Sequence, residues 1–115
     1  MTFKLNLHGI ESECVLKIGR YINNSNLALG LVTTTGKLYT GITKNIEKLP
    51  KNQAAIDVYD CTWAEEFILK HKLGTNTGKE LYEYHQDWSG HCTYPVYEFD
   101  MNRIKEIAEI THCDK

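Results

Sequence analysis

Apolar side chains stand at every second position through the first third of the chain, and this spacing argues against a helical start. Cys14, Leu16 and Ile18 would share one side of a strand, because side chains alternate between the two faces of an extended backbone. The run 27–32 is apolar on both faces, which is typical of a central strand. Residues 37–43 return with Leu38 and Ile42 inward, so we predict a meander of antiparallel strands.

Turns and a loop separate these strands. Asn23–Asn26 is predicted to turn, because asparagine tolerates left-handed φ angles and bonds its own backbone. Residues 44–52, which contain Pro50, are expected to form a basic loop, and residues 54–59 a further strand.

Two helices are predicted in the second half of the chain. Residues 62–65, Thr-Trp-Ala-Glu, have the spacing of a capping box, in which the Thr and Glu side chains each accept a backbone N–H. This helix is expected over residues 62–73, stopped by Gly74. Asp100 is expected to cap a second helix over residues 101–111.

Two aromatic-rich strands, 80–84 and 93–99, are predicted between the helices, after a loop at residues 75–78. Pro95 cannot donate to a strand ladder, so the second strand is expected to lie at an edge or to be bulged there. Two orientations of the first strand remain open. Either Leu81 faces the core and the tyrosines face solvent, or the tyrosines are buried.

This order of elements predicts one α+β domain over residues 1–115, with a mostly antiparallel sheet of about five strands backed by two helices. A chain of 115 residues has room for one such core. The expected core residues are Leu16, Leu29, Leu31, Ile42, Trp63, Phe67, Ile68, Ile104 and Ile107.

Composition disfavours proteins that bind nucleic acid and proteins that span a membrane. The net charge of −2 disfavours a protein that grips nucleic acid phosphates, whose affinity depends on clustered basic residues. No apolar run approaches the roughly 20 residues that cross a bilayer, and the N-terminus lacks a signal peptide's apolar middle. We therefore expect a cytoplasmic protein with free thiols, no cofactor, no membrane partner and no direct nucleic acid partner.

An enzyme that uses a metal or a thiol is the first alternative. The pairs His91-Cys92 and His112-Cys113 carry zinc-ligand types, but adjacent residues of a strand point to opposite faces. Cys61 precedes the predicted helix, whose dipole could lower the pKa of its thiol. The sequence contains no cysteine hydrolase signature around these thiols, and a structural role for them is the simpler interpretation.

Charge is divided unevenly along the chain. Residues 1–53 hold seven Lys and Arg against three Asp and Glu, whereas residues 54–115 hold six against twelve. In the second half the carboxylates alternate with aromatic residues, a composition that suits docking on a basic protein surface. The candidate partner-binding residues are Asp57, Asp60, Glu66, Glu80, Tyr82, Glu83, Tyr84, Asp87 and Trp88. Among these, Asp87 and Trp88 lie between two strands and are expected to be accessible anchors.

Three stretches of sequence resemble a family that has no known function. They are Asn24-x-x-Leu27-Ala28-Leu29-x-Leu31, Gly36-x-x-Tyr39-x-x-Ile42-Thr43-x-Asn45 and Ser89-Gly90-x-x-x-Tyr94-Pro95-x-Tyr97-x-Phe99. The family is a small bacterial one, carried on plasmids, conjugative elements and prophages, and the resemblance spans residues 13–100. It implies no catalytic residues, but it does imply a mobile-element setting in which small accessory proteins often counter host defences.

The expected function is therefore that of a binding protein that inhibits a host defence nuclease, either a CRISPR effector or a restriction enzyme. Its acidic, aromatic surface would occupy a channel that binds nucleic acid. A DNA-binding regulator is the second alternative to this function. It would use the basic residues Lys17, Arg20, Lys37, Lys44, Lys48 and Lys51.

Overall fold

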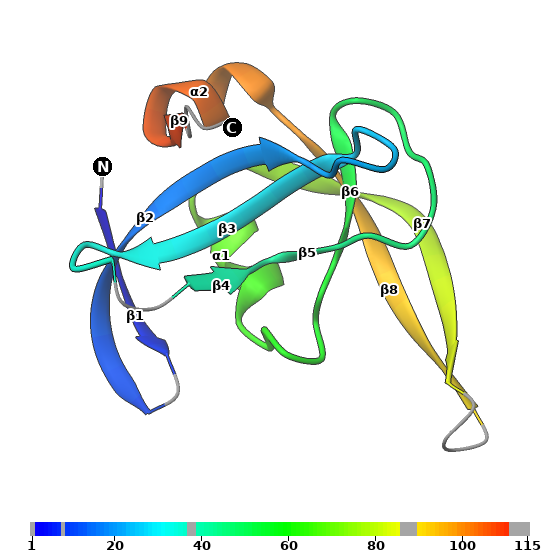
Figure 1. Ribbon diagram of the computed structural model, residues 1–115, viewed down its shortest axis with the longest axis horizontal. Helices are drawn as coiled ribbons and strands as arrows, with labels where there is room; N and C mark the ends of the chain where they lie inside the picture. The colour runs from blue at the N-terminus through cyan, green and yellow to red at the C-terminus, as the bar shows by residue number, and fades with distance from the viewer. Residues whose placement is uncertain (1, 8, 37–38, 86–89, 111–115) are drawn as a thin grey trace.

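The computed structural model describes residues 2–7, 9–36, 39–85 and 90–110 of the chain (Figure 1). Nine strands and two helices form within these residues. Their bounds are β1 Thr2–Leu7, β2 Ile10–Arg20, β3 Leu27–Thr33, β4 Tyr39–Gly41, β5 Thr43–Lys44, β6 Gln53–Ile56, α1 Ala64–Lys70, β7 Gly74–His85, β8 Gly90–Phe99, α2 Met101–Ile107 and β9 Glu109–Ile110.

The strands form two sheets. Sheet A has the order β1-β2-β3-β4, with β9 paired to β2, and sheet B has the order β5-β6-β8-β7. The β2–β9 pair is parallel and the other described pairs are antiparallel. The α+β class, the mostly antiparallel pairing and the opening meander are therefore confirmed. The prediction of about five strands in one sheet is wrong, since the described residues form nine strands in two sheets.

The chain crosses from sheet A to sheet B at Ile42. The Ile42 N–H donates to the carbonyl of Leu29 in sheet A, at 2.8 Å, while the Ile42 carbonyl accepts from Asp57 N–H, also at 2.8 Å. One residue thus bonds to segments of both sheets. This double bonding divides the single predicted strand 37–43 into β4 and β5.

The main core lies between the inner face of sheet A, one face of sheet B and the two helices. Eight of the nine predicted core residues are buried there. The exception is Trp63, which is half-buried at the start of α1 and packs its ring edge-on against Phe67, at a centroid distance of 5.9 Å. The predicted core is otherwise confirmed.

A second, smaller core covers the other face of sheet B. It contains Leu81, Tyr94 and Val96, and the loop after β5 contributes Leu49 and the half-buried Ile46. Leu81 is 4% exposed while its neighbour Tyr82 is 61% exposed. Of the two orientations considered for this strand, the one with Leu81 inward and Tyr82 outward is confirmed.

Helix α1 begins two residues later than predicted, and the capping box does not form. Its N-cap residue is Trp63, with no side-chain capping bond. The Glu65 carboxylate accepts instead from the phenol of Tyr97, at 2.7 Å. A tertiary hydrogen bond to a buried tyrosine has therefore replaced the local bond to Thr62.

Helix α1 also ends earlier than predicted, before Gly74. Lys72 takes the left-handed conformation, with φ of 57°, and Leu73 N–H bonds back to the carbonyl of Ile68 at 2.9 Å. Together with the bond from Lys72 N–H to Leu69, this is the Schellman arrangement that ends helices. Lys72 therefore supplies the left-handed residue that ends the helix, and Gly74 is instead the first residue of β7.

The loop predicted at residues 75–78 is instead part of β7. The register of β7 against β8 shifts between Asn76 and Glu80, and Gly78 has a φ of 86°. The side chains of Asn76 and Thr77 accept the backbone N–H groups of Gly78 and Lys79. The turn-forming residues thus build a bulge within a strand.

Pro95 lies opposite Glu80, at the end of this irregular stretch. Strand β8 is internal to sheet B, so the edge expectation is wrong, whereas the expected irregularity is present on the neighbouring strand.

Helix α2 has the predicted cap. The Asp100 carboxylate accepts from the N–H groups of Asn102 and Arg103, at 3.1 and 3.2 Å. The helix ends at Ile107, because Ala108 is extended and leads into β9 beside β2. The prediction of a helix to residue 111 is therefore too long.

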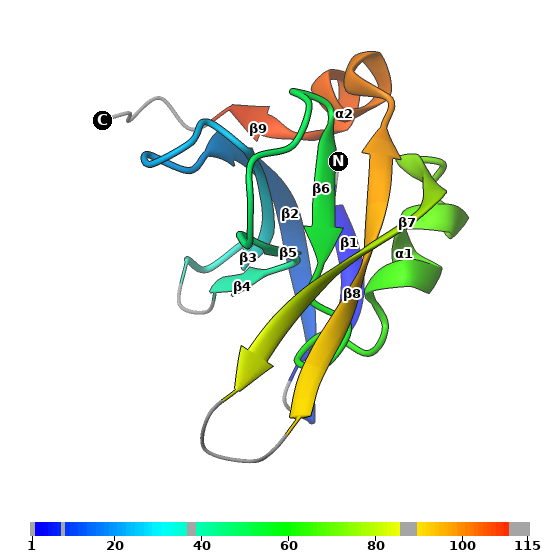
Figure 2. The same cartoon turned by 90° about the vertical axis from the view of Figure 1, so that its right-hand side faces the viewer.

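The far end of the β7–β8 hairpin points away from α1 and α2 in both views (Figures 1 and 2). In both, α1 lies well away from that end. Neither helix of the described chain is long and apolar enough to span a membrane.

Candidate functional site

Strand β6 ends at Ile56, three residues earlier than predicted. Asp57 N–H turns away to bond the carbonyl of Ile42, and the Asp57 carboxylate accepts from Asp60 N–H at 3.3 Å. Residues 57–60 therefore form a turn, which leaves the side chain of Tyr59 53% exposed. A strand predicted through Tyr59 does not identify its side chain as an exposed candidate contact. The Asp57-x-x-Asp60 spacing, which is typical of a turn, is the signal that could have identified it.

Tyr59 attaches this turn to the projecting hairpin. Its phenol oxygen accepts from the backbone N–H of Thr93, at 3.1 Å, and its ring packs edge-on against Tyr94, at 5.2 Å. Thr93 lies directly opposite Tyr82 in the register of β7 and β8. Two exposed tyrosines thus lie on either side of β8. We call Tyr59, Asp60, Glu80 and Tyr82 the tyrosine–acid surface; all four side chains are exposed.

Glu83 lies on the other face of β7, beside a lysine. Lys44 Nζ is 3.3 Å from the Glu83 carboxylate and 5.7 Å from the centroid of the Tyr94 ring. Burial raises the pKa of Tyr94 above its ordinary value, and the nearby Cys92, Glu83 and Asp57 raise it further. Burial also raises the pKa of the Asp57 carboxyl. Asp57, Glu83 and Lys44 therefore lie near the Tyr94 ring, against which Tyr59 packs.

Not all of the predicted residues gather here. Glu66 lies on α1, where it lines a groove against β1 together with Thr2 and Lys4. The structure describes the backbone of Tyr84 but not its side chain, and Asp87 and Trp88 lie outside the described residues. Of the predicted residues, Asp57 and Asp60 therefore lie on the turn that Tyr59 attaches to the hairpin, and Glu80, Tyr82 and Glu83 lie on β7 of that hairpin.

The expected effect of the α1 dipole on Cys61 is wrong. The thiol is 1% exposed and donates to the carbonyl of Gly41, at 3.4 Å. Burial, with further contributions from Asp57 and Asp60, raises the pKa of Cys61 to about 11. A neutral, buried thiol lacks the thiolate character that a nucleophile needs. Cys14 and Cys92 are also buried and free, while Cys113 lies outside the described residues.

Cys61 is therefore expected to resist alkylation. At pH 8 a thiol with a pKa near 11 is ionised in only about one molecule in a thousand, so iodoacetamide should modify native Cys61 at least about tenfold more slowly than the urea-unfolded chain. Mass spectrometry of the Cys61 peptide separates it from the other thiols. Equal rates in the native and unfolded chains would contradict the burial of Cys61.

Metal-ligand types do not converge in the described chain. Among residues 2–7, 9–36, 39–85 and 90–110 there is no group of three or more His, Cys, Asp or Glu side chains that could hold a metal ion. The side chain of His91 is not described, and His112 lies outside the described residues.

Several basic residues of the DNA-binding alternative bond to the protein itself. Arg20 donates to the carbonyl of Lys51 at 2.6 Å, Lys48 donates to the carbonyl of Asn24, and Lys44 pairs with Glu83. The bonds of Arg20 and Lys48 reach neighbouring loops, and the Lys44–Glu83 pair joins β5 to β7. Lys37 lies outside the described residues.

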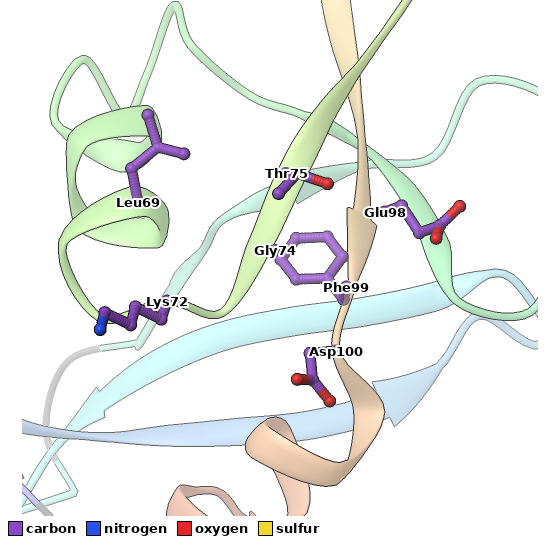
Figure 3. A pocket seen from close by; sticks show the side chains of 7 residues that line it. All are labelled: Leu69, Lys72, Gly74, Thr75, Glu98, Phe99 and Asp100. Carbon is purple, nitrogen blue, oxygen red and sulfur yellow. The ribbon is translucent and has the colours of Figure 1, made fainter.

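An open groove of about 500 Å³ lies between the end of α1 and the junction of β7, β8 and α2 (Figure 3). Its two carboxylates already have structural partners, since Asp100 caps α2 and Glu98 accepts from Gln53. The groove therefore presents no uncommitted pair of carboxylates for acid–base chemistry.

The fold and the candidate site define a small α+β protein of two sheets with a projecting hairpin rich in tyrosine and carboxylate. Over residues 15–114 the chain matches the family described as Domain of unknown function (DUF4313), and the chain belongs to that family. No curated protein and no solved structure matches the chain significantly. The resemblance to a family without known function is thus confirmed at that level.

Proposed function

We propose that this protein is a binding protein without catalytic activity, whose tyrosine–acid surface docks on a basic, nucleic-acid-binding surface of a protein partner. The observation that carries the proposal is the pair of exposed tyrosines, Tyr59 and Tyr82, on either side of β8 with Asp60 and Glu80 around them. Tyrosines supply large contact areas at interfaces, and carboxylates steer a basic partner into place.

The partner that we propose is a host defence nuclease, either a CRISPR effector or a restriction enzyme. Such enzymes hold nucleic acid in channels lined by Lys and Arg, so an acidic hairpin that enters the channel excludes the substrate. A projecting two-stranded hairpin suits insertion into a channel better than a flat sheet face would (Figure 2). The bacterial mobile-element setting implied by the resemblance supports the same partner class.

The structural partners of several carboxylates in the described chain also favour binding over catalysis. Glu83 pairs with Lys44, Glu65 accepts from Tyr97, and Asp100 caps α2. Each of these carboxylates has a structural partner, whereas a general acid or base must exchange protons with a substrate.

Removal of Tyr82 or reversal of the charge at Asp60 is expected to weaken inhibition. We expect Tyr82→Ala and Asp60→Lys each to raise the half-inhibitory concentration at least about tenfold, because each removes an exposed contact of the surface. The measurement is DNA cleavage by a panel of purified CRISPR effectors and restriction enzymes, titrated with each variant. Glu66→Lys is the matched control, because Glu66 is an exposed carboxylate on the distant α1.

Inhibition that survives both substitutions, or that falls equally with Glu66→Lys, would contradict this location of the surface. A gel shift without nuclease tests the DNA-binding alternative. DNA binding by the chain alone, weakening steeply with salt, would replace the proposed function.

A further inference from the structure

Strand β7 is the terminal strand of sheet B, and no described strand lies beyond it. Its direction of hydrogen bonding follows from β8. Phe99 N–H donates to Asn52, and Thr93 N–H donates to Tyr59, so the odd-numbered residues of β8 direct their backbone groups away from β7, although Pro95 has no N–H to donate. In an antiparallel pair, residues opposite such positions also direct their backbone groups outward.

The residues of β7 opposite these positions are Glu80, Tyr82 and Tyr84. Their backbone N–H and carbonyl groups therefore point from the outer edge of sheet B. The first part of β7 has a different edge, because the bulge between Asn76 and Glu80 and the exposed Lys79 interrupt regular pairing there. Bulges and lysines at a sheet edge discourage the addition of a further strand. The bulge ends at Glu80, and residues 80–84 contain no lysine.

We propose that the outer edge of residues 80–84 binds an extended segment of the partner as an added antiparallel strand, with Arg or Lys at alternate positions. The proposal rests on the proposed function and assigns the mode of recognition at the same surface. Strand addition uses main-chain hydrogen bonds for affinity and alternate side chains for specificity.

The negative charge of this segment favours a basic partner strand over a second copy of the chain. Residues 80–88 contain three carboxylates and no Lys or Arg, so self-pairing would bring like charges together. A partner strand with Arg opposite Glu80 and Tyr82 instead places one cation beside an exposed carboxylate and another beside an exposed ring.

Three blocked hexapeptides of alternating Arg and Val test the geometry. One is unmodified, one carries N-methyl groups on its Arg residues, and one carries them on its Val residues. Arg residues opposite Glu80 and Tyr82 direct their N–H groups toward β7. We therefore expect N-methyl-Arg to weaken binding at least about tenfold, and N-methyl-Val to leave it unchanged.

NMR titration measures the affinity, and amide exchange locates the bound peptide. Exchange should slow at Glu80, Tyr82 and Tyr84. Equal binding of all three peptides would show charge attraction alone and overturn the proposal, as would absence of binding or protection confined to other strands. The peptide titration contains no nuclease, so its result is independent of the proposed function. Peptide binding by this edge, together with no inhibition of any nuclease in the cleavage assay, would refute the proposed function and leave the edge assignment intact.

A pair of variants supplies an independent test. Glu80→Ala and Glu80→Pro both remove the carboxylate, but only proline removes the outward N–H, which does not bond to β8. We expect both variants to fold, with the proline variant binding the unmodified peptide at least about tenfold more weakly. Equal affinities would overturn the proposal. Sedimentation of the parent chain should show a monomer, and a dimer abolished by Glu80→Pro would overturn the choice of partner.

Discussion

Replacement of Asn26 by alanine is expected to lower the free energy of unfolding by about 3 kcal/mol. The side chain is 3% exposed and holds the loop after β5 in place. Its amide nitrogen donates to the Asn45 side chain at 3.1 Å and to the Glu47 carbonyl at 2.7 Å, while its oxygen accepts from Leu49 N–H at 2.9 Å. Truncation leaves the buried N–H of Leu49 and the partly buried carbonyl of Glu47 without these partners, and an unpaired buried group costs about 1–3 kcal/mol.

Urea unfolding followed by circular dichroism measures this change. Asn23→Ala is the control, because Asn23 is exposed and contributes one acceptor to Asn45, at 2.9 Å. It should cost less than about 0.5 kcal/mol. A loss below about 1 kcal/mol for Asn26→Ala would show that water or a shifted loop replaces the buried bonds.

The substitution Gly74→Ala is expected to cost about 2–3 kcal/mol, because the first residue of β7 lies against the backbone of β8. A Cβ atom at Gly74 would stand 2.5 Å from the Glu98 carbonyl oxygen and 3.1 Å from the Cα of Phe99. These are main-chain atoms of a paired strand, so they cannot rotate away (Figure 3).

Gly19→Ala is the matched control for Gly74→Ala. Gly19 is also a strand residue, but its added Cβ would meet nothing within 4 Å. Because alanine restricts the unfolded chain, this control should be neutral or stabilising by up to about 1 kcal/mol. The same urea experiment compares the two variants. Equal stabilities would mean that β7 shifts to accommodate the methyl group, and the start of β7 would then show altered amide exchange.

The family-like pattern has a structural explanation in several of its residues. The Thr43 hydroxyl accepts from Leu29 N–H at 3.2 Å and shares a hydrogen bond with the Tyr21 phenol. The Asn24 side chain donates to Asn45 at 3.1 Å. These residues join the turn after β2 to the crossing between the sheets, so the pattern describes construction of the fold more than chemistry at a site.

Local patterns predicted the elements whose causes lie close in sequence. The alternation in β2 and β3 and the Asp100 cap of α2 follow from side chains and backbone within a few residues, whereas the sequence left the orientation of Leu81 open. The acidic and aromatic composition likewise indicated the second half of the chain as the candidate binding region. Five of the predicted residues lie on the hairpin and its adjoining turn.

Long-range contacts decided the rest. The bond from Tyr97 to Glu65 replaced a capping box, and the two bonds of Ile42 divided one predicted strand between two sheets. The contact of Tyr59 with Thr93 joins residues 34 positions apart, which no local spacing reveals. The sequence by itself determined the alternation, the turns and the charge of each segment, because these depend on neighbouring residues. Only the tertiary structure decided which segments meet, because those hydrogen bonds form between groups that folding brings together.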